Sequence, residues 1–321
     1  VEAPDRAEED ARRALDLLEA DDGSPPPTAL AARALRRVAE AESALGRREM
    51  ASERLAQALD LARRADASYE ESALMLLESR RLRHDGRPAE ARPSARASLE
   101  IAEEDAPPLL LGPVYFENGS VAADLHRRSE ALDHQRRALS LYRELKLDRA
   151  VWQTLLTLAA SERHREKPDA AARHTREAIA VARRTGHIQG TARGHLQMAR
   201  IALDDADFEE TRRHLFDGID LVEETAYSRL RGLLHAHLAL AEAALGRVEK
   251  ATGGCDWAAD LLASGSDDGW AEAIGLMRRG LDVARIAHGI DDPDALPAVC
   301  EAFVAAADRL AGTPAGDQFL Q

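Results

Sequence analysis

The stretch AEAESALGRREMASERLAQALDLA, residues 39–62, holds two segments rich in Ala, Leu and charged residues on either side of LGR at residues 45–47. Ala and Leu are strong helix formers, and the glycine permits a tight turn between two helices. Three small residues, Ala39, Ala51 and Ala58, stand where two such helices would cross. The stretch therefore predicts an antiparallel helix pair whose backbones approach closely at small side chains.

The pattern returns at a constant spacing, and all three small positions stay small through six repeats. The first column is Ala39, Ser79, Gly119, Ala159, Ala199 and Ala239; the second is Ala51, Ala91, Ala131, Ala171, Thr211 and Ala251; the third is Ala58, Ser98, Ala138, Ala178, Gly218 and Ala258. A larger apolar residue follows the third column in five of the six repeats. Three columns in one register predict an all-α chain of stacked helix pairs.

Small residues at these three places resemble the consensus of the tetratricopeptide repeat (TPR), in an extended form with a period of about 40 residues. The resemblance covers residues 28–265. The repeats there are similar to TPR arrays of bacterial signalling and regulatory proteins. It implies a right-handed α-solenoid of antiparallel helix pairs. The aromatic positions of the family are mostly not met, which leaves the subfamily open.

The domain organisation follows from this register. We expect residues 1–20 to be the trailing helix of a truncated repeat, because residues 7–18 align with residues 51–62. We expect six helix pairs over residues 28–265, a capping pair over 268–311 and a mobile tail over 312–321. The sequence begins at Val1 in mid-pattern, and we interpret it as part of a longer protein.

Composition limits the classes of partner. The net charge is −14, whereas domains that bind nucleic acid usually have a basic excess. No apolar run approaches the roughly 18 residues of a membrane span, so we expect neither a nucleic acid nor a membrane as partner. Two cysteines in 321 residues fit a reducing cytoplasm, and the Arg- and Ala-rich composition is typical of bacteria.

The TPR resemblance implies that the first helix of each pair lines a concave face that binds a partner. Carried over by position, the partner-binding residues are Arg36, Arg80, Arg83, His84, Phe116, Arg163, His164, Arg193, Arg200 and His237. Arginine exceeds acid among the inward positions, which favours an acidic segment or a C-terminal carboxylate. The alternative is that these arginines are solvated or pair with Glu and Asp of neighbouring helices.

Sequence motifs for catalysis are missing. The chain has no GxxxxGK[ST], GxGxxG or GxSxG motif, so we expect no enzymatic activity and no cofactor. His195 and His235 lie one repeat apart in one column, without a Cys or carboxylate at a convincing ligand spacing. We interpret both histidines as structural and expect no metal site.

Two functional hypotheses remain. In the first, the chain is a non-catalytic scaffold that binds a protein or peptide. In the second, it is an intramolecular sensor arm of a larger signalling protein, such as a STAND ATPase, a kinase or a protease. The sequence does not specify the partner or the oligomeric state, because groove side chains are not fixed by the fold.

Overall fold

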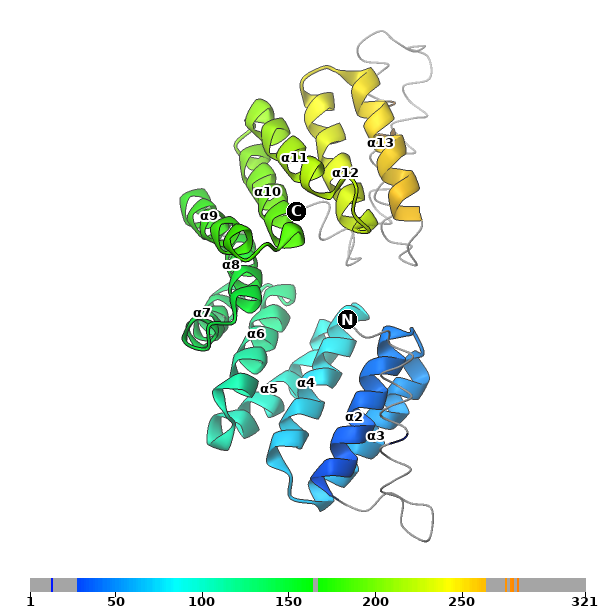
Figure 1. Ribbon diagram of the computed structural model, residues 1–321, viewed down its shortest axis with the longest axis vertical. Coiled ribbons are helices and arrows are strands. Elements are labelled where there is room, and N and C mark those ends of the chain that lie inside the picture. The colour runs from blue at the N-terminus through cyan, green and yellow to red at the C-terminus, as the bar shows by residue number, and fades with distance from the viewer. Residues whose placement is uncertain are drawn as a thin grey trace. The chain divides into compact units, whose positions relative to one another are not determined.

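A computed structural model describes residues 28–163 and 167–263, together with Arg13, Gly275, Arg278, Arg279 and Asp282. The described ranges are helices joined by short turns, with no strand among them, which confirms the all-α prediction (Figure 1). The predicted trailing helix at 1–20, capping pair at 268–311 and tail at 312–321 lie outside the described residues, apart from those single positions.

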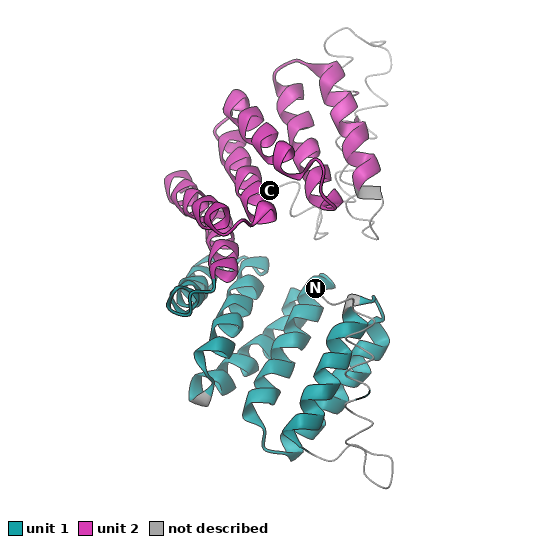
Figure 2. Ribbon diagram, in the orientation of Figure 1, with its two compact units in different colours: residues 1–147 teal, residues 148–321 magenta. Residues whose placement is uncertain are grey.

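Six helix pairs follow one another along the chain. The helices are α2 (Ala29–Ala44), α3 (Arg48–Arg64), α4 (Ser68–His84), α5 (Pro88–Asp105), α6 (Pro108–Asp124), α7 (Arg128–Glu144), α8 (Asp148–Arg163), α9 (Pro168–Arg184), α10 (Ile188–Asp204), α11 (Phe208–Val222), α12 (Ser228–Ala244) and α13 (Val248–Ala263). The chain divides into two compact units, Val1–Leu147 and Asp148–Gln321, called unit 1 and unit 2 (Figure 2). Each unit has three of these pairs.

The small-residue columns lie where the helices pack most closely. All eighteen positions are buried, which confirms their predicted role. The two glycines in the columns show how little space remains. A Cβ atom on Gly119 would lie 2.8 Å from Gln135 Cγ, and one on Gly218 would lie 2.8 Å from Leu234 Cδ2. Larger side chains here would force the helices apart, because helix interfaces are packed to near-crystalline density.

Most of the described turns between helices share one hydrogen-bond pattern. After α2, the N–H of Arg47 donates to Glu42 O at 2.9 Å and that of Gly46 to Ser43 O at 3.1 Å. This is the Schellman arrangement, which needs a left-handed residue just after the helix. Glycine supplies it at some turns and a non-glycine residue at others: Gly46, Asp66, Gly86, His126, Lys146, Gly186, Ala206 and Gly246. Successive positions in this series are half a repeat or one whole repeat apart. The connections after α5 and α11 differ, since Ala106 is extended and the N–H of Thr225 donates to Val222 O.

Helix α6 begins at a proline, Pro108. Proline at the first helical position has a favourable φ angle, and its missing N–H would have no partner there in any case. Pro113 lies inside the same helix, just after its first turn.

Exchanging residues between two equivalent turns tests the role of the left-handed position. Ala206 has φ of 55° and Gly246, one repeat later, has φ of 73°. We expect Ala206→Gly to raise the free energy of unfolding, and Gly246→Ala to lower it by about 1 kcal/mol, because Cβ disfavours left-handed backbone. Urea unfolding of the two variants measures these changes in the free energy of unfolding. A shift of both unfolding midpoints in the same direction would contradict the prediction.

Candidate functional site

The inner face of each unit is formed by the first helices of the pairs. In unit 1, α4 contacts both α2 and α6; in unit 2, α10 contacts both α8 and α12. Among the described residues, no second helix contacts another second helix. The first helices therefore lie closer together than the second helices, and each unit curves toward them. We use "inner face" for the exposed side of α2, α4 and α6, and separately for that of α8, α10 and α12.

Carboxylates neutralise the arginines at the start of the inner face of unit 1. Glu70 of α4 is almost fully buried and accepts hydrogen bonds from two arginines of α2. Arg33 Nε lies 2.6 Å from one of its oxygens and Arg36 Nε 3.3 Å from the other. Arg36 also donates to Glu40 at 2.7 Å. The predicted partner-binding residue Arg36 is thus held inside an ion-pair network.

The same arrangement recurs between α4 and α6. Glu117 is 1% exposed and lies 3.0 Å from Arg83 Nε and 3.7 Å from Arg80 Nε. Ser79 donates to the same carboxylate at 3.1 Å. Arg83 is also 3.6 Å from Asp124. Ion pairing with the next first helix, which the sequence left as an alternative, is therefore the observed arrangement for Arg80 and Arg83.

The other predicted residues of unit 1 differ in exposure. His84 is the last residue of α4 and is exposed, and Phe116 on α6 is half-buried. Its neighbour Tyr115 turns away into the packing against α5 and α7, where its hydroxyl donates to Glu103 at 2.6 Å. Arg137 of α7 stacks over the Tyr115 ring.

Removing the charge of Glu117 should weaken unit 1. In Glu117→Gln the guanidinium groups of Arg80 and Arg83 lose a buried counter-charge, so we expect a loss of about 2–3 kcal/mol in the free energy of unfolding. Glu100→Gln is the matched control. The side chain of Glu100 is 70% exposed, and its ion pair with Arg96, at 3.6 Å, lies at the surface. The control should change stability by less than about 0.5 kcal/mol. Equal losses in urea unfolding would refute the buried-pair interpretation.

In unit 2 a group of basic side chains lies toward the C-terminal ends of the first helices; we call Arg163, Arg200 and His237 the C-side cluster. The side chain of Arg163 is 6% exposed and donates two hydrogen bonds to the carboxylate of Asp204, at 3.0 and 2.9 Å. Burial and then the charge of Arg163 lower the pKa of Arg200 to about 10. Burial and then the charges of Arg200 and Arg163 lower the pKa of His237 to about 4. The three predicted residues therefore lie close together, and at neutral pH the two arginines are the charged members.

A second cationic cluster lies nearer the N-terminal ends of the same helices; we call Arg149, Arg193 and Arg229 the N-side cluster. The pKa of Arg193 is lowered, first by desolvation within the surrounding protein and then by the charges of Arg229 and Arg149. All three side chains keep contact with solvent. The sequence prediction missed Arg149 and Arg229. Arg149 and Arg229 lie two repeats apart at the same place in the repeat, and this recurrence could have revealed them. They were missed because this place is not among the inward positions taken from the family.

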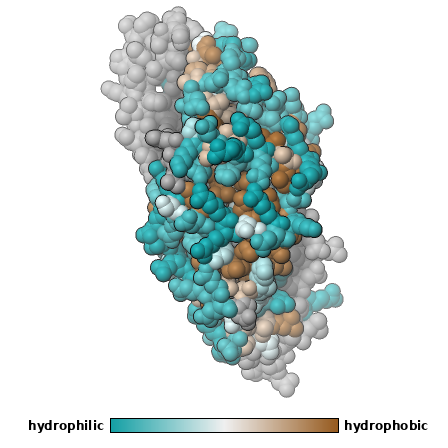
Figure 3. Space-filling view, turned by 90° about the vertical axis from the view of Figure 1, so that its left-hand side faces the viewer, coloured by the Kyte–Doolittle hydropathy of each residue, from teal (hydrophilic) through white to brown (hydrophobic). Residues whose placement is uncertain are grey.

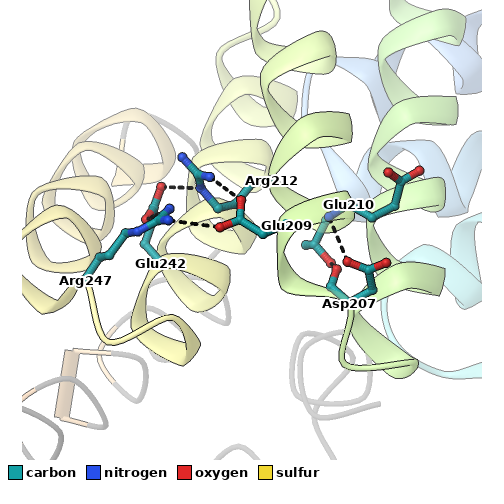
Figure 4. A network of polar contacts seen from close by, with 7 residues as sticks. Asp207, Glu209, Glu210, Arg212, Glu242 and Arg247 are labelled. Atoms are coloured by element: carbon teal, nitrogen blue, oxygen red, sulfur yellow. Dashed lines mark hydrogen bonds and ion pairs between the residues drawn. The ribbon is translucent and has the colours of Figure 1, made fainter.

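The charge balance differs between the two inner faces. Helices α2, α4 and α6 carry six arginines and seven carboxylates, whereas α8, α10 and α12 carry six arginines and four carboxylates. Two of those four are engaged by second helices or turns. Asp148 accepts from Arg184 of α9 at 2.9 Å, and Glu242 lies 2.7 Å from Arg212 and 3.3 Å from Arg247 (Figure 4). Positive charge therefore gathers on the inner face of unit 2.

Other expected features add little to the site. His164 lies outside the described residues. Cys255 is buried, and burial raises the pKa of its thiol to about 11, which keeps it protonated at neutral pH. Figure 3 shows one face on which hydrophilic side chains dominate and hydrophobic ones gather along the middle. Among the described residues, no helix has the length and apolar character to cross a membrane.

The lowered pKa of His237 gives a pH dependence. Its Nδ1 donates to Leu233 O at 2.8 Å, while burial and the charges of Arg200 and Arg163 hold the ring neutral at neutral pH. Folded His237 takes up a proton near pH 4, whereas an unfolded histidine does so near pH 6.5. Between these values the unfolded state binds more protons, so the contribution of His237 to stability falls as the pH falls from about 6.5 to 4.

We therefore expect the stability of His237→Gln to fall less between pH 7.5 and pH 5 than that of the parent chain. Urea unfolding at the two pH values measures the difference. Parallel losses in the two proteins would show that His237 is not held neutral. Titration of the carboxylates affects both chains alike and cancels in the comparison.

The fold and inner face define a TPR-type solenoid, as the sequence predicts. No protein-family model and no curated protein sequence matches the chain. Solved structures do match it. Aspartyl phosphate phosphatase F from Bacillus subtilis has 14% identity over 89% of this chain and 73% of its own, with a TM-score of 0.67. A STAND protein with a TPR sensor from Pyrococcus horikoshii has 15% identity over 92% of this chain and 44% of its own, with a TM-score of 0.67.

A third similar structure is the quorum sensor NprR from B. thuringiensis in its apo form, with 12% identity over 91% of this chain and 86% of its own. Its TM-score is 0.65. NprR has also been solved in complex with its cognate peptide NprX, with a TM-score of 0.59 to this chain. At these identities the likeness establishes the fold.

Proposed function

We propose that this chain is a non-catalytic scaffold that binds an acidic protein or peptide segment on the inner face of unit 2. The observation that carries the proposal is the crowding of like charges on three successive first helices. The pKa of Arg200 is lowered partly by Arg163, and that of Arg193 by Arg229 and Arg149. A carboxylate between such groups relieves their repulsion, and arginine can hold it with two parallel hydrogen bonds.

The two clusters suggest a spacing for the ligand. Arg193 and Arg200 are seven residues apart on α10, which corresponds to about 10 Å along a helix. An extended peptide advances about 3.3 Å per residue, so carboxylates about three residues apart would reach both clusters. A C-terminal carboxylate together with an acidic side chain near it also fits. The expected ligand is therefore a short segment with at least two negative groups.

The inner face of unit 1 is a poorer candidate, although Arg36, Arg80, Arg83, His84 and Phe116 were predicted there. The carboxylates of Glu70 and Glu117 already occupy its arginines. An incoming acidic group would have to displace a buried intramolecular partner and leave that partner uncompensated, which is costly. We therefore assign the partner-binding role to Arg193, Arg200 and His237, with Arg149 and Arg229 added. Arg163 lies beside them but is already paired with Asp204.

The solved complex of NprR with a peptide supports binding of a peptide by a similar fold. A second candidate function is that of a sensor segment of a larger signalling protein. The match to the STAND protein favours it, because that structure contains a TPR sensor and this chain covers only 44% of its length. Both functions use protein recognition, and they differ in whether the effector lies on the same polypeptide.

Binding of a labelled peptide measures the proposal directly. The probe is a labelled peptide of sequence Gly-Glu-Gly-Gly-Glu-Gly, whose two Glu residues are three positions apart, and its binding is followed by fluorescence anisotropy. We expect Arg193→Gln/Arg229→Gln to weaken binding at least tenfold, because both residues are exposed and their loss should leave the fold intact. We also expect affinity to fall as salt is raised, since the contacts are electrostatic.

The matched control is Arg96→Gln/Arg136→Gln. It removes the same charge from exposed positions on the second helices α5 and α7. A peptide with Gln in place of Glu controls for binding to apolar surface. Equal weakening in the two double variants, or equal affinity for the Gln peptide, would overturn the assignment to the inner face of unit 2.

A further inference from the structure

Two imidazoles and a carboxylate meet between α10 and α11. His214 and Asp217 are three residues apart on α11 and so share one face of that helix, and His195 reaches them from α10. His195 Nδ1 lies 3.3 Å from His214 Nδ1 and 3.5 Å from Asp217 Oδ2. One ligand atom of each residue lies within 4.8 Å of the others.

These separations match those between ligands of one metal ion. Zinc–nitrogen and zinc–oxygen bonds are about 2.0–2.2 Å, so two ligands at a tetrahedral angle lie about 3.3–3.6 Å apart. The two distances from His195 Nδ1 are within this range. Both histidines are buried, whereas the side chain of Asp217 is 48% exposed and leaves a path from solvent.

Close packing of the two helices brings the ligands together. Gly218, next to Asp217, belongs to the third small-residue column, and a Cβ atom on it would lie 3.4 Å from the Cβ of His195. A larger residue at this position would move α11 away from α10. The fold therefore fixes the separation of the histidines through backbone packing, which is the preorganisation that a metal site needs.

Glu210 lies beside the outer nitrogen of His214. Its Oε1 is 3.2 Å from His214 Nε2, without the alignment of a hydrogen bond. With the proton on Nε2, Nδ1 would offer its lone pair to a metal ion. This carboxylate–histidine arrangement is the usual support of a metal-bound imidazole. Glu210 is itself paired with Arg213 and anchored by its backbone N–H on Asp207 (Figure 4).

Arg183 works against the metal at the other histidine. Its guanidinium lies 3.0 Å from His195 Nε2 and donates to it, which leaves the proton on Nδ1, directed at His214 and Asp217. Metal binding at Nδ1 would move this proton to Nε2 or to solvent and require Arg183 to withdraw. Arg183 is exposed on the last turn of α9, so its side chain has room to do so.

The geometry points to a site for a divalent metal ion of the zinc class, formed by His195, His214 and Asp217, with Arg183 as an intramolecular competitor. Two imidazoles and one carboxylate suit Zn²⁺ and neighbouring transition metals better than Mg²⁺ or Ca²⁺, which prefer all-oxygen ligands. A bound ion would link α10 to α11 and stabilise the folded chain by an amount that grows with the logarithm of ion concentration over Kd. The site is separate from the acidic-segment face and does not depend on it.

Titration of the metal-stripped chain with Zn²⁺ by calorimetry, and with Co²⁺ by visible absorption, tests the site. We expect one ion per chain and a higher midpoint of thermal unfolding with Zn²⁺. Asp217→Asn should lower the affinity at least tenfold, because it removes the anionic ligand with little change of shape. Asp220→Asn is the matched control, because it also replaces an acidic residue of α11 with a neutral one, at an exposed position. This variant should bind Zn²⁺ as tightly as the parent chain does.

Arg183→Ala separates a metal site from a purely hydrogen-bonded histidine pair. Loss of a competing donor and of a nearby positive charge should tighten metal binding by about tenfold, the scale of changes around metal ligands. If the network is only structural, this variant gains no affinity. Absence of saturable binding in the parent chain, or equal affinities of Asp217→Asn and Asp220→Asn, overturns the proposal.

Discussion

Close approach of helices at small side chains is the constraint on which the rest of this structure depends. Eighteen positions in three columns are buried, and the glycines among them leave no room even for a methyl group. Because the columns repeat with a constant period, each pair packs on the next with the same offset. The first helices of each unit are thereby brought side by side, and their outward side chains form one continuous face.

The same repetition makes charge the main variable of the inner face. Equivalent positions recur on neighbouring first helices. An arginine on one first helix therefore contacts the side chain that the next first helix places beside it. In unit 1 that residue is a buried Glu, as between Arg83 and Glu117. In unit 2 the position of Glu117 is occupied by Thr157, Gln197 and His237, none of which is anionic. The framework is thus constant, while the residues that face its arginines differ between the two units.

The sequence predicted the fold more completely than the site. Columns of small residues depend only on spacing, so the helix pairs follow from it directly. The start of α6 at Pro108 does not follow from these columns, because they fix where helices cross and not where each helix begins. The ion pairs of Arg80 and Arg83 depend on a carboxylate of the next first helix, whose side-chain direction spacing alone does not give. Spacing also places His195 in one column with His235, whereas the His195 ring contacts His214 and the His235 ring contacts Trp257.

The central claim is that recognition occurs on the inner face of unit 2. Hydrogen exchange of the full chain, followed by mass spectrometry with and without a saturating acidic peptide, locates the contact most directly. The account predicts slower exchange in α8, α10 and α12, with little change in α2, α4 and α6. Protection confined to unit 1, or to the second helices, would contradict it.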